Sequence, residues 1–150
     1  MTKRKLKQKH GYIRTGGGVL IFNKEKKVLL MKRGIESENE AGWWSKPGGA
    51  IEIGETAIKA MKREIKEELD IEINIWGYLP HTDHIIKKEN QCWIAINYLA
   101  DIKFGNPRIM EPRKCEEINW FSLKKLPRKL TQSTREPIKY YLNKKYIKLH

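Results

Sequence analysis

The arrangement of apolar residues predicts an α/β fold, a sandwich in which helices pack on the faces of a mixed β-sheet. Three observations support this prediction. Several apolar, β-branched segments have the length of strands, the segment 56–69 has the spacing of an amphipathic helix, and no linker or internal repeat divides the 150 residues. A chain of this length can bury one core, so we expect a single domain over 1–150.

The first two strands are expected at 15–22 and 28–33. Both segments are apolar and rich in β-branched residues, and the polar segment 23–27 between them has the composition of a turn. The two strands are therefore predicted to form a hairpin.

A loop and then a helix are expected next. The loop covers 43–50, because Pro47-Gly48-Gly49 cannot lie inside a helix and offers a backbone that a ligand can approach closely. The helix runs to Leu69 with Thr56 as its N-cap, since apolar residues then recur every four positions, at Ala57, Met61, Ile65 and Leu69.

The second half of the chain predicts three strands and a helix. Alternating polarity over 71–78 is typical of an outer strand, whereas 92–99 is apolar nearly throughout and indicates a buried strand. A short final strand is expected at 117–121. Near the end, apolar spacing predicts a C-terminal helix with an aromatic inward face, formed by Ile138, Tyr140, Tyr141, Leu142 and Tyr146.

Three glutamates share one side of the 56–69 helix. Glu64, Glu67 and Glu68 stand at positions i, i+3 and i+4, while the apolar residues line another side. Carboxylate oxygens of this kind suit Mg²⁺ or Mn²⁺ rather than zinc, and Mg²⁺ commonly bridges carboxylates to phosphates. The alternative is an exposed face of salt bridges, because basic residues alternate with the glutamates at Lys59, Lys62, Arg63 and Lys66.

The wider segment resolves this choice. It runs Gly49-Ala-Ile-Glu-Ile-Gly-Glu55-Thr-Ala-Ile-Lys-Ala-Met-Lys-Arg63-Glu64-Ile-Lys-Glu67-Glu68-Leu-Asp70-Ile71, and it resembles the Nudix box, G-x5-E-x7-R-E-U-x-E-E-x-G-U, at eight of nine specified positions. The departure is Asp70, which stands where the family has glycine. Asp tolerates a left-handed backbone better than most residues, so we expect a left-handed residue after the helix rather than a loss of catalysis.

The resemblance implies a Nudix-type α/β/α sandwich and assigns roles to the box residues. Glu64, Glu67 and Glu68 are implied to hold Mg²⁺, which Mn²⁺ can replace, together with a backbone carbonyl of Gly48 or Gly49. Glu55 and Arg63 are implied to orient these ligands from behind, since arginine can grip a carboxylate with two hydrogen bonds. The catalytic set is thus Glu64, Glu68 and Arg63, with Glu64 ranked ahead of Glu68 as the base.

An additional metal ligand from outside the box is also considered. The three candidates, each weighed against a plain surface charge, are Glu111, Glu116 and Glu117.

The substrate implied by the resemblance is a nucleotide. Relatives acting on dinucleoside polyphosphates or RNA 5′ ends often carry Pro-Gln-Gly-Gly, whereas this chain has Lys46-Pro47-Gly48-Gly49. The downstream sequence is similar to the MutT-like branch, which implies hydrolysis of a nucleoside triphosphate to a monophosphate and pyrophosphate. An ADP-ribose or nucleotide-sugar pyrophosphatase is the alternative. Trp44, Lys46 and Phe121 are the candidate substrate-binding residues, with Trp43 and Trp120 as further aromatic candidates.

The net charge of +13 lies mostly at the two ends of the chain. Residues 1–10 carry a net +5 and residues 128–150 a net +6, whereas 11–127 carry only +2. This distribution favours a basic arm over 1–10 beside a balanced domain. It also motivates a competing hypothesis, a non-enzymatic nucleic-acid-binding module on the same scaffold, but the retained Arg63 and glutamates make nucleic acid the weaker choice of partner.

Other features exclude several classes. No run of about 18 apolar residues and no signal-peptide core occurs, so we expect a cytoplasmic protein without membrane contact. The two cysteines, Cys92 and Cys115, have neither metal-ligand spacing nor disulfide density. His81-Thr-Asp83-His84 is interpreted as a polar inter-strand loop rather than a metal site. The sequence leaves the choice between monomer and homodimer open.

Overall fold

The computed structural model describes residues 12–37 and 40–149, so the basic arm predicted over 1–10 lies outside the described part of the chain. The strands and helices follow in this order: β1 (Tyr12–Phe22), β2 (Val28–Arg33), β3 (Trp44–Ser45), β4 (Gly48–Ala50), α2 (Ala57–Leu69), β5 (Glu72–Ile86), the short 3₁₀ helix η1 (Lys87–Glu89), β6 (Gln91–Phe104), β7 (Cys115–Phe121), α3 (Gln132–Leu142) and β8 (Ile147–Lys148).

The strands form one mixed sheet. Its described order is β3-β2-β1-β6-β5-β8, with β4 paired to β1 and β7 paired to β2. The central β1 and β6 run parallel over their length, whereas the other pairs are antiparallel. The mixed sheet predicted from the sequence is thus confirmed.

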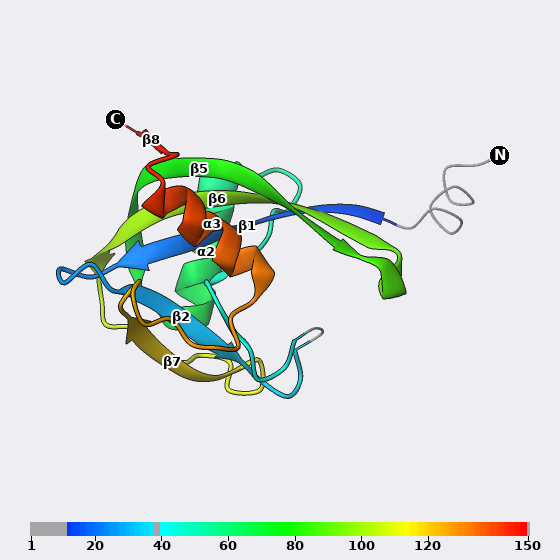
Figure 1. The fold of residues 1–150 in the computed structure, drawn as a ribbon, viewed down its shortest axis with the longest axis horizontal. Helices are drawn as coiled ribbons and strands as arrows, with labels where there is room; N and C mark the ends of the chain where they lie inside the picture. The colour runs from blue at the N-terminus through cyan, green and yellow to red at the C-terminus, as the bar shows by residue number, and fades with distance from the viewer. Residues whose placement is uncertain (1–11, 38–39, 150) are drawn as a thin grey trace.

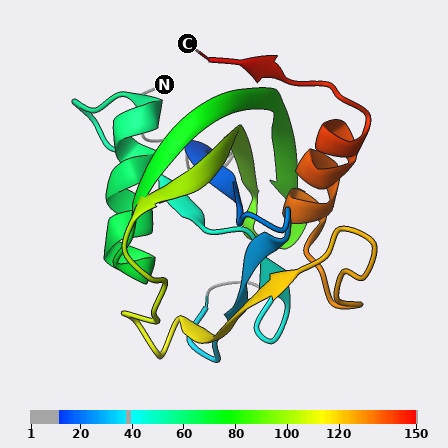
Figure 2. The same ribbon diagram turned by 90° about the vertical axis from the view of Figure 1, so that its left-hand side faces the viewer.

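The two helices lie on opposite sides of the strands, which confirms the predicted sandwich (Figures 1 and 2). Alternate residues of β1 separate the two cores: Val19 and Ile21 face α2, while Leu20 and Phe22 face α3. From α2 the residues Met61, Ile65 and Leu69 are fully buried in the first core, as the four-residue spacing predicted. Thr56 caps this helix, because its side chain accepts a hydrogen bond from the Lys59 backbone N–H at 3.2 Å.

The predicted loop at 43–50 contains two short strands instead. β3 pairs with β2, and β4 pairs with β1 through Gly16, Gly17 and Gly18. The reason is the close approach of two glycine-rich backbones, since a Cβ on Gly48 would overlap the Gly17 carbonyl. The predicted hairpin is antiparallel as expected, but β1 and β2 pair only at Phe22 and Val28, and β2 otherwise pairs with β3 and β7.

The strand predicted at 71–78 extends to Ile86, so the prediction of a loop over His81–His84 was wrong. β6 is long enough to pair with the added residues, and Thr82 is buried where Asn97 of β6 donates a hydrogen bond to its hydroxyl at 3.2 Å. Figure 1 shows the resulting three-stranded extension of β1, β6 and β5. β8 covers β5 only at Gly77 and Tyr78.

The C-terminal helix lies earlier than predicted. It spans Gln132–Leu142 and buries Ile138 against the sheet. Tyr146 lies after the helix, where its ring stacks on Tyr141 with centroids 5.6 Å apart. The inward-facing aromatic residues are therefore confirmed, but only part of them belongs to the helix, and Leu142 is exposed. The strand predicted at 117–121 begins two residues earlier, as β7. It is not the last strand of the chain, because β8 follows it.

Asp70 adopts the predicted left-handed conformation at the end of α2. Its φ is 54°, and its backbone N–H donates to the Lys66 carbonyl. The side chain also forms ion pairs with Lys66 at 3.2 Å and with Arg108 at 3.0 Å. Hydrogen bonds from these two groups lower the pKa of Asp70. Asp70 thus combines a strained backbone with two favourable ion pairs.

Two substitutions separate these effects. Asp70→Asn keeps the tolerance of left-handed backbone and removes the charge, whereas Asp70→Gly relieves the backbone as well. We expect Asp70→Asn to melt below wild type and Asp70→Gly to melt above Asp70→Asn. Because the pKa of Asp70 is lowered on folding, the difference in melting temperature between wild type and Asp70→Asn should disappear as acid protonates the carboxylate. Equal melting temperatures at neutral pH and low salt would contradict a role for the ion pairs.

Candidate active site

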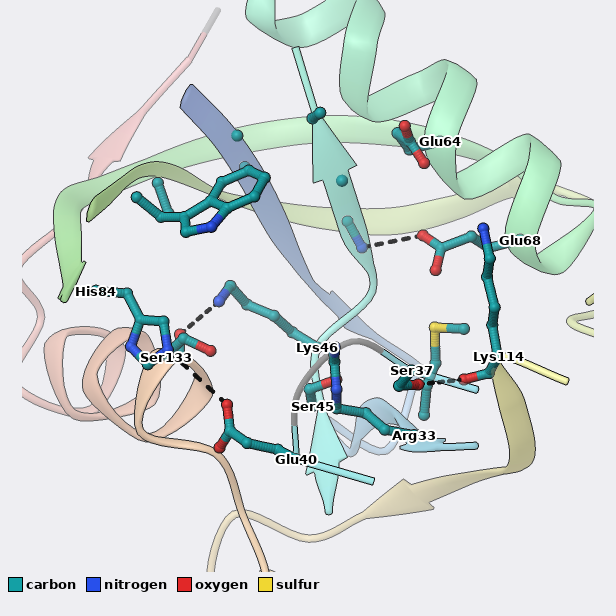
Figure 3. A pocket seen from close by; sticks show the side chains of 18 of the residues that line it. Arg33, Ser37, Glu40, Ser45, Lys46, Glu64, Glu68, His84, Lys114 and Ser133 are labelled. Carbon is teal, nitrogen blue, oxygen red and sulfur yellow. Dashed lines mark hydrogen bonds and ion pairs between the residues drawn. The ribbon is translucent and has the colours of Figure 1, made fainter. Parts of the chain in front are cut away.

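A cavity of about 520 Å³ opens beside the carboxylate-bearing side of α2. It lies within the size range of small-molecule sites. Its walls come from all the strands β1 to β6, from α2, from the beginning of α3 and from the segments around Glu36 and Glu111, and both acidic and basic side chains line it. Figure 3 shows Glu64 and Glu68 on one side, His84 and Glu40 on the other, and Lys46 reaching between them.

Helix α2 presents Glu64 and Glu68 one turn apart on the cavity wall. Strand β4 brings its backbone against both carboxylates. The Gly48 N–H donates to Glu68 Oε1 at 3.2 Å, and a Cβ on Gly49 would lie 2.5 Å from Glu64 Oε2. The glycines are therefore needed because a side chain at Gly49 would displace the Glu64 carboxylate. This arrangement places two carboxylates and the backbone of two adjacent glycines in one small region.

The two carboxylates lack sufficient positive charge around them. Burial raises the pKa of both, and for Glu68 burial and then the nearby charge of Glu64 raise the pKa to about 8. Glu111, which lines the same cavity, raises both values further. A divalent cation would relieve this repulsion, so the donor set fits Mg²⁺. Within the described residues, however, no three His, Cys, Asp or Glu side chains converge closely enough to form a complete ligand group.

Arg63 organises the acidic residues from behind. Its guanidinium donates to Glu55 Oε1 at 2.7 Å and Oε2 at 3.0 Å, to Glu64 Oε1 at 3.1 Å, and to the Ala50 carbonyl at 3.2 Å. The hydrogen bonds from Arg63 lower the pKa of Glu55 to about 2, so Glu55 stays ionised and fixes the guanidinium. Arg63 does not line the cavity, and its place in the network is that of a positioning residue.

The third box glutamate and two of the other acidic candidates lie apart from the cavity lining. Glu67 is exposed and lies 3.4 Å from Arg63. Glu116 is exposed and pairs with Lys32 at 3.6 Å, and Glu117 is exposed on β7. Of the three candidates outside the box, the structure brings only Glu111 to the cavity.

Lys46 is half-buried in the cavity rather than solvated. Its ammonium donates to the Ser133 carbonyl at the start of α3, and its backbone N–H donates to Thr134 Oγ1 at 2.9 Å. Burial lowers the pKa of Lys46 to about 8, while Glu136 opposes this shift. Three further cationic residues line the same cavity: Arg14, Arg33 and Lys114. The cavity thus joins an acidic wall to several positive charges.

The predicted aromatic residues do not line the cavity. Trp44 and Phe121 pack edge to face, with centroids 4.9 Å apart, beside the core under α3. The pairing of β2 with β3 and with β7 fixes this position. Trp120 packs against the core under α2, and Trp43 also lies outside the cavity lining. The substrate-binding assignment of Trp44 and Phe121 therefore finds no geometric support.

Several cavity residues were not predicted from the sequence, among them Arg14, Glu40, His84 and Trp93. The Arg14 guanidinium lies 4.8 Å from the centroid of the Trp93 ring, and His84 Nε2 lies 3.9 Å from Glu40 Oε1. Alternation along the 92–99 strand could have shown that Trp93 and Ala95 share a face, but no local signal identifies their strand partners. His81 and Asp83 are exposed and face each other at 3.5 Å.

Comparisons with known proteins agree with this fold. Residues 13–141 match the family model described as the NUDIX domain. A solved MutT NUDIX hydrolase from Burkholderia pseudomallei is 38% identical with a TM-score of 0.79, and the match covers 85% of this chain and 97% of that one. The MutT protein from Methanosarcina mazei has a TM-score of 0.76 at 23% identity, covers 88% of this chain and 94% of its own, and shows the same fold.

Two curated relatives carry different activities. The ADP-ribose pyrophosphatase of Methanocaldococcus jannaschii is 31% identical over 141 residues, which are 93% of this chain and 80% of the relative. The mRNA-decapping enzyme subunit 2 of Saccharomyces cerevisiae is 29% identical over 128 residues, 83% of this chain, but this chain spans only 12% of that protein's length. Among the helices that the structure describes, none is long and apolar enough to cross a membrane.

The charge repulsion at Glu68 yields a prediction for the metal-free protein. An acid whose pKa rises from 4.5 to about 8 on folding destabilises the folded state increasingly as pH rises through that interval. We expect the wild-type melting temperature in EDTA to fall between these pH values, and Glu68→Gln to show a smaller fall. Glu72→Gln, at an exposed position of β5, is the matched control and should follow wild type. If the melting temperatures of all three proteins fell equally with pH, the inferred burial of the Glu68 charge would be contradicted.

Proposed function

Since the chain belongs to the NUDIX family of pyrophosphohydrolases, we propose that it cleaves nucleoside triphosphates to a nucleoside monophosphate and pyrophosphate. The observation that carries this proposal is the composition of the cavity. Two partly buried carboxylates on α2 share it with Lys46, Arg33, Lys114 and Arg14. Polyphosphates need both a metal held by carboxylates and direct cationic contacts, because their charge is high and spread over several oxygens.

Glu64 and Glu68 are the proposed metal ligands from α2, with a carbonyl oxygen from Gly48 or Gly49. The raised pKa values of both carboxylates support a cation at this position, and Mg²⁺, which Mn²⁺ could replace, matches their hard oxygen donors. When bound, such an ion neutralises phosphate charge and lowers the pKa of an attacking water. Glu67 remains a proposed ligand only through a rotation of its exposed side chain, because Arg63 holds it outside the cavity.

The remaining residues have distinct proposed roles. Arg63 and Glu55 hold the Glu64 carboxylate in place, so that Glu64 can accept the proton of the attacking water. Lys46 lies between the two ends of the cavity and is placed to contact the phosphate chain (Figure 3). Its ammonium would exchange the Ser133 carbonyl for a phosphate oxygen, which is a stronger acceptor because it is charged.

A second candidate is hydrolysis of ADP-ribose or a nucleotide sugar. The relative from Methanocaldococcus jannaschii favours it, because that similarity covers most of both chains. The chemistry at Glu64 and Glu68 would be the same, since a diphosphate linkage is cleaved in both cases. The difference lies in the group beyond the second phosphate. A non-enzymatic binding module is disfavoured, because membership of an enzyme family accompanies two partly buried carboxylates at the cavity wall.

A substrate panel tests the proposed reaction. The purified protein is incubated with Mg²⁺ and, separately, the common nucleoside triphosphates, ADP-ribose, a UDP-sugar and capped RNA, and products are separated by chromatography. We expect one or more triphosphates to yield monophosphate and pyrophosphate, with the highest kcat/KM of the panel. Faster cleavage of ADP-ribose to AMP and ribose 5-phosphate would instead establish the second candidate. Release of only inorganic phosphate would reject both.

Glu68→Gln tests the metal site. The substitution keeps the size of the side chain and removes one charge from the proposed ligand pair, so we expect kcat/KM to fall by about 100-fold or more. Glu72→Gln should retain wild-type turnover. Circular dichroism and thermal melts confirm that both variants are folded. A folded Glu68→Gln protein with wild-type turnover and wild-type dependence on Mg²⁺ would overturn the assignment of α2 as the catalytic element.

A further inference from the structure

Three residues from three strands form one row on the cavity face of the sheet. Arg14 of β1 pairs in register with Trp93 of β6, and Trp93 pairs in register with His84 of β5. Side chains paired across neighbouring strands point to the same side, and all three line the cavity. The opposite face of the same strands carries Ile13 and Ile85, which are exposed.

The Trp93 ring lies close to β1 because Gly16 has no side chain. A Cβ at Gly16 would lie only 3.1 Å from Cζ3 and 3.3 Å from Cε3 of the ring. The indole N–H donates to Gln91 Oε1 at 3.4 Å, so the polar edge of the ring has a partner within β6. These contacts hold the ring in place at the cavity wall, where one of its faces carries Arg14.

The position of Arg14 shows that this face accepts a planar group. Its guanidinium carbon lies over the ring, 4.8 Å from the centroid, which is within the range of a cation–π contact. Arg14 is exposed and can move to the rim, and an exposed cation–π contact is weaker than the stacking of a base on an aromatic ring. A ligand with a flat base can therefore displace the guanidinium from the ring.

His84 and Glu40 supply polar groups beside this platform. They face each other at 3.9 Å, and they lie across the cavity from Glu64 and Glu68 (Figure 3). The Glu40 carboxylate can accept hydrogen bonds from N–H groups on the edge of a base, while the imidazole of His84 can donate or accept. Glu40 also has a positive φ of 56°, an unusual conformation for a residue other than glycine.

From this geometry we infer that Trp93 stacks against the base of the nucleotide, with Arg14, His84 and Glu40 contacting the base edge. The inference rests on the proposed function for the position of the phosphates at Lys46 and the α2 carboxylates. It deepens that function by naming the group that distinguishes substrates. A ligand with phosphates but no aromatic base would leave the Trp93 face without a partner.

Binding of the two products separates base contacts from phosphate contacts. The dissociation constants of nucleoside monophosphates and of pyrophosphate are measured with Mg²⁺ by calorimetry for wild type, Trp93→Ala, Trp93→Phe and Ile85→Ala. The last variant removes an exposed side chain from the opposite face of the same strands. We expect Trp93→Ala to weaken binding of the preferred monophosphate by roughly 5- to 150-fold and to leave pyrophosphate binding within about twofold. Trp93→Phe should restore most of the loss, and Ile85→Ala should match wild type.

Fluorescence provides a measurement that does not depend on the alanine variant being folded. Binding of the preferred monophosphate should quench the tryptophan emission of wild type, and Trp93→Phe should lose this quenching while still binding. Glu40→Gln should change the order of preference among the bases, because an amide replaces an acceptor-only carboxylate with a group that also donates.

Any of three outcomes would overturn the inference. Equal weakening of monophosphate and pyrophosphate by Trp93→Ala would show that the ring only supports the cavity. Unchanged monophosphate binding by a folded Trp93→Ala, or quenching that persists in Trp93→Phe, would show that the base lies elsewhere. Because product binding needs no turnover, an inactive wild type that still shows the Trp93 effect would reject the proposed reaction and leave the base site intact.

Discussion

The close approach of strand β4 to helix α2 is the constraint on which the site depends. Gly48 and Gly49 lie between β1 and the helix. A side chain on Gly48 would overlap the Gly17 carbonyl, and a side chain on Gly49 would overlap the Glu64 carboxylate. This approach lets the Gly48 N–H contact Glu68 and holds two carboxylates at the cavity wall. The helix itself is fixed by Met61, Ile65 and Leu69, which are fully buried against the sheet. Packing of the apolar side therefore determines where the acidic side points.

Charge is distributed unevenly around this contact. Hydrogen bonds from Arg63 lower the pKa of Glu55 to about 2, whereas burial raises the pKa of Glu68 to about 8. One arginine thus stabilises Glu55 and one oxygen of Glu64, while burial still raises the pKa of both cavity carboxylates. Such a division suits a metal site, because the supporting residues remain ordered whether or not the ligand positions are filled.

The long central strands line the part of the cavity that lies away from α2. β1, β5 and β6 continue past the helices, and their registers place Arg14, Trp93 and His84 in one row. The cavity therefore runs from the acidic wall of α2, past Lys46, to an aromatic platform (Figure 3). Under the two proposals, the hydrolytic chemistry depends on α2 and the choice of substrate on the strands, so substitutions on the strands are expected to alter specificity without disturbing α2.

The sequence by itself determined the features that depend on local order. The periodicity of α2, its Thr56 cap, the left-handed Asp70 and the spacing of its glutamates all follow from neighbouring residues. Tertiary structure decided which of these residues share a cavity. It placed Glu67 with Arg63 outside the cavity, packed the partly buried Trp44 against Phe121, and brought Trp93 and His84 into the cavity instead. The reason is that strand order and register pair residues far apart in the chain, and single-sequence periodicity shows which residues share a face but not which strands meet.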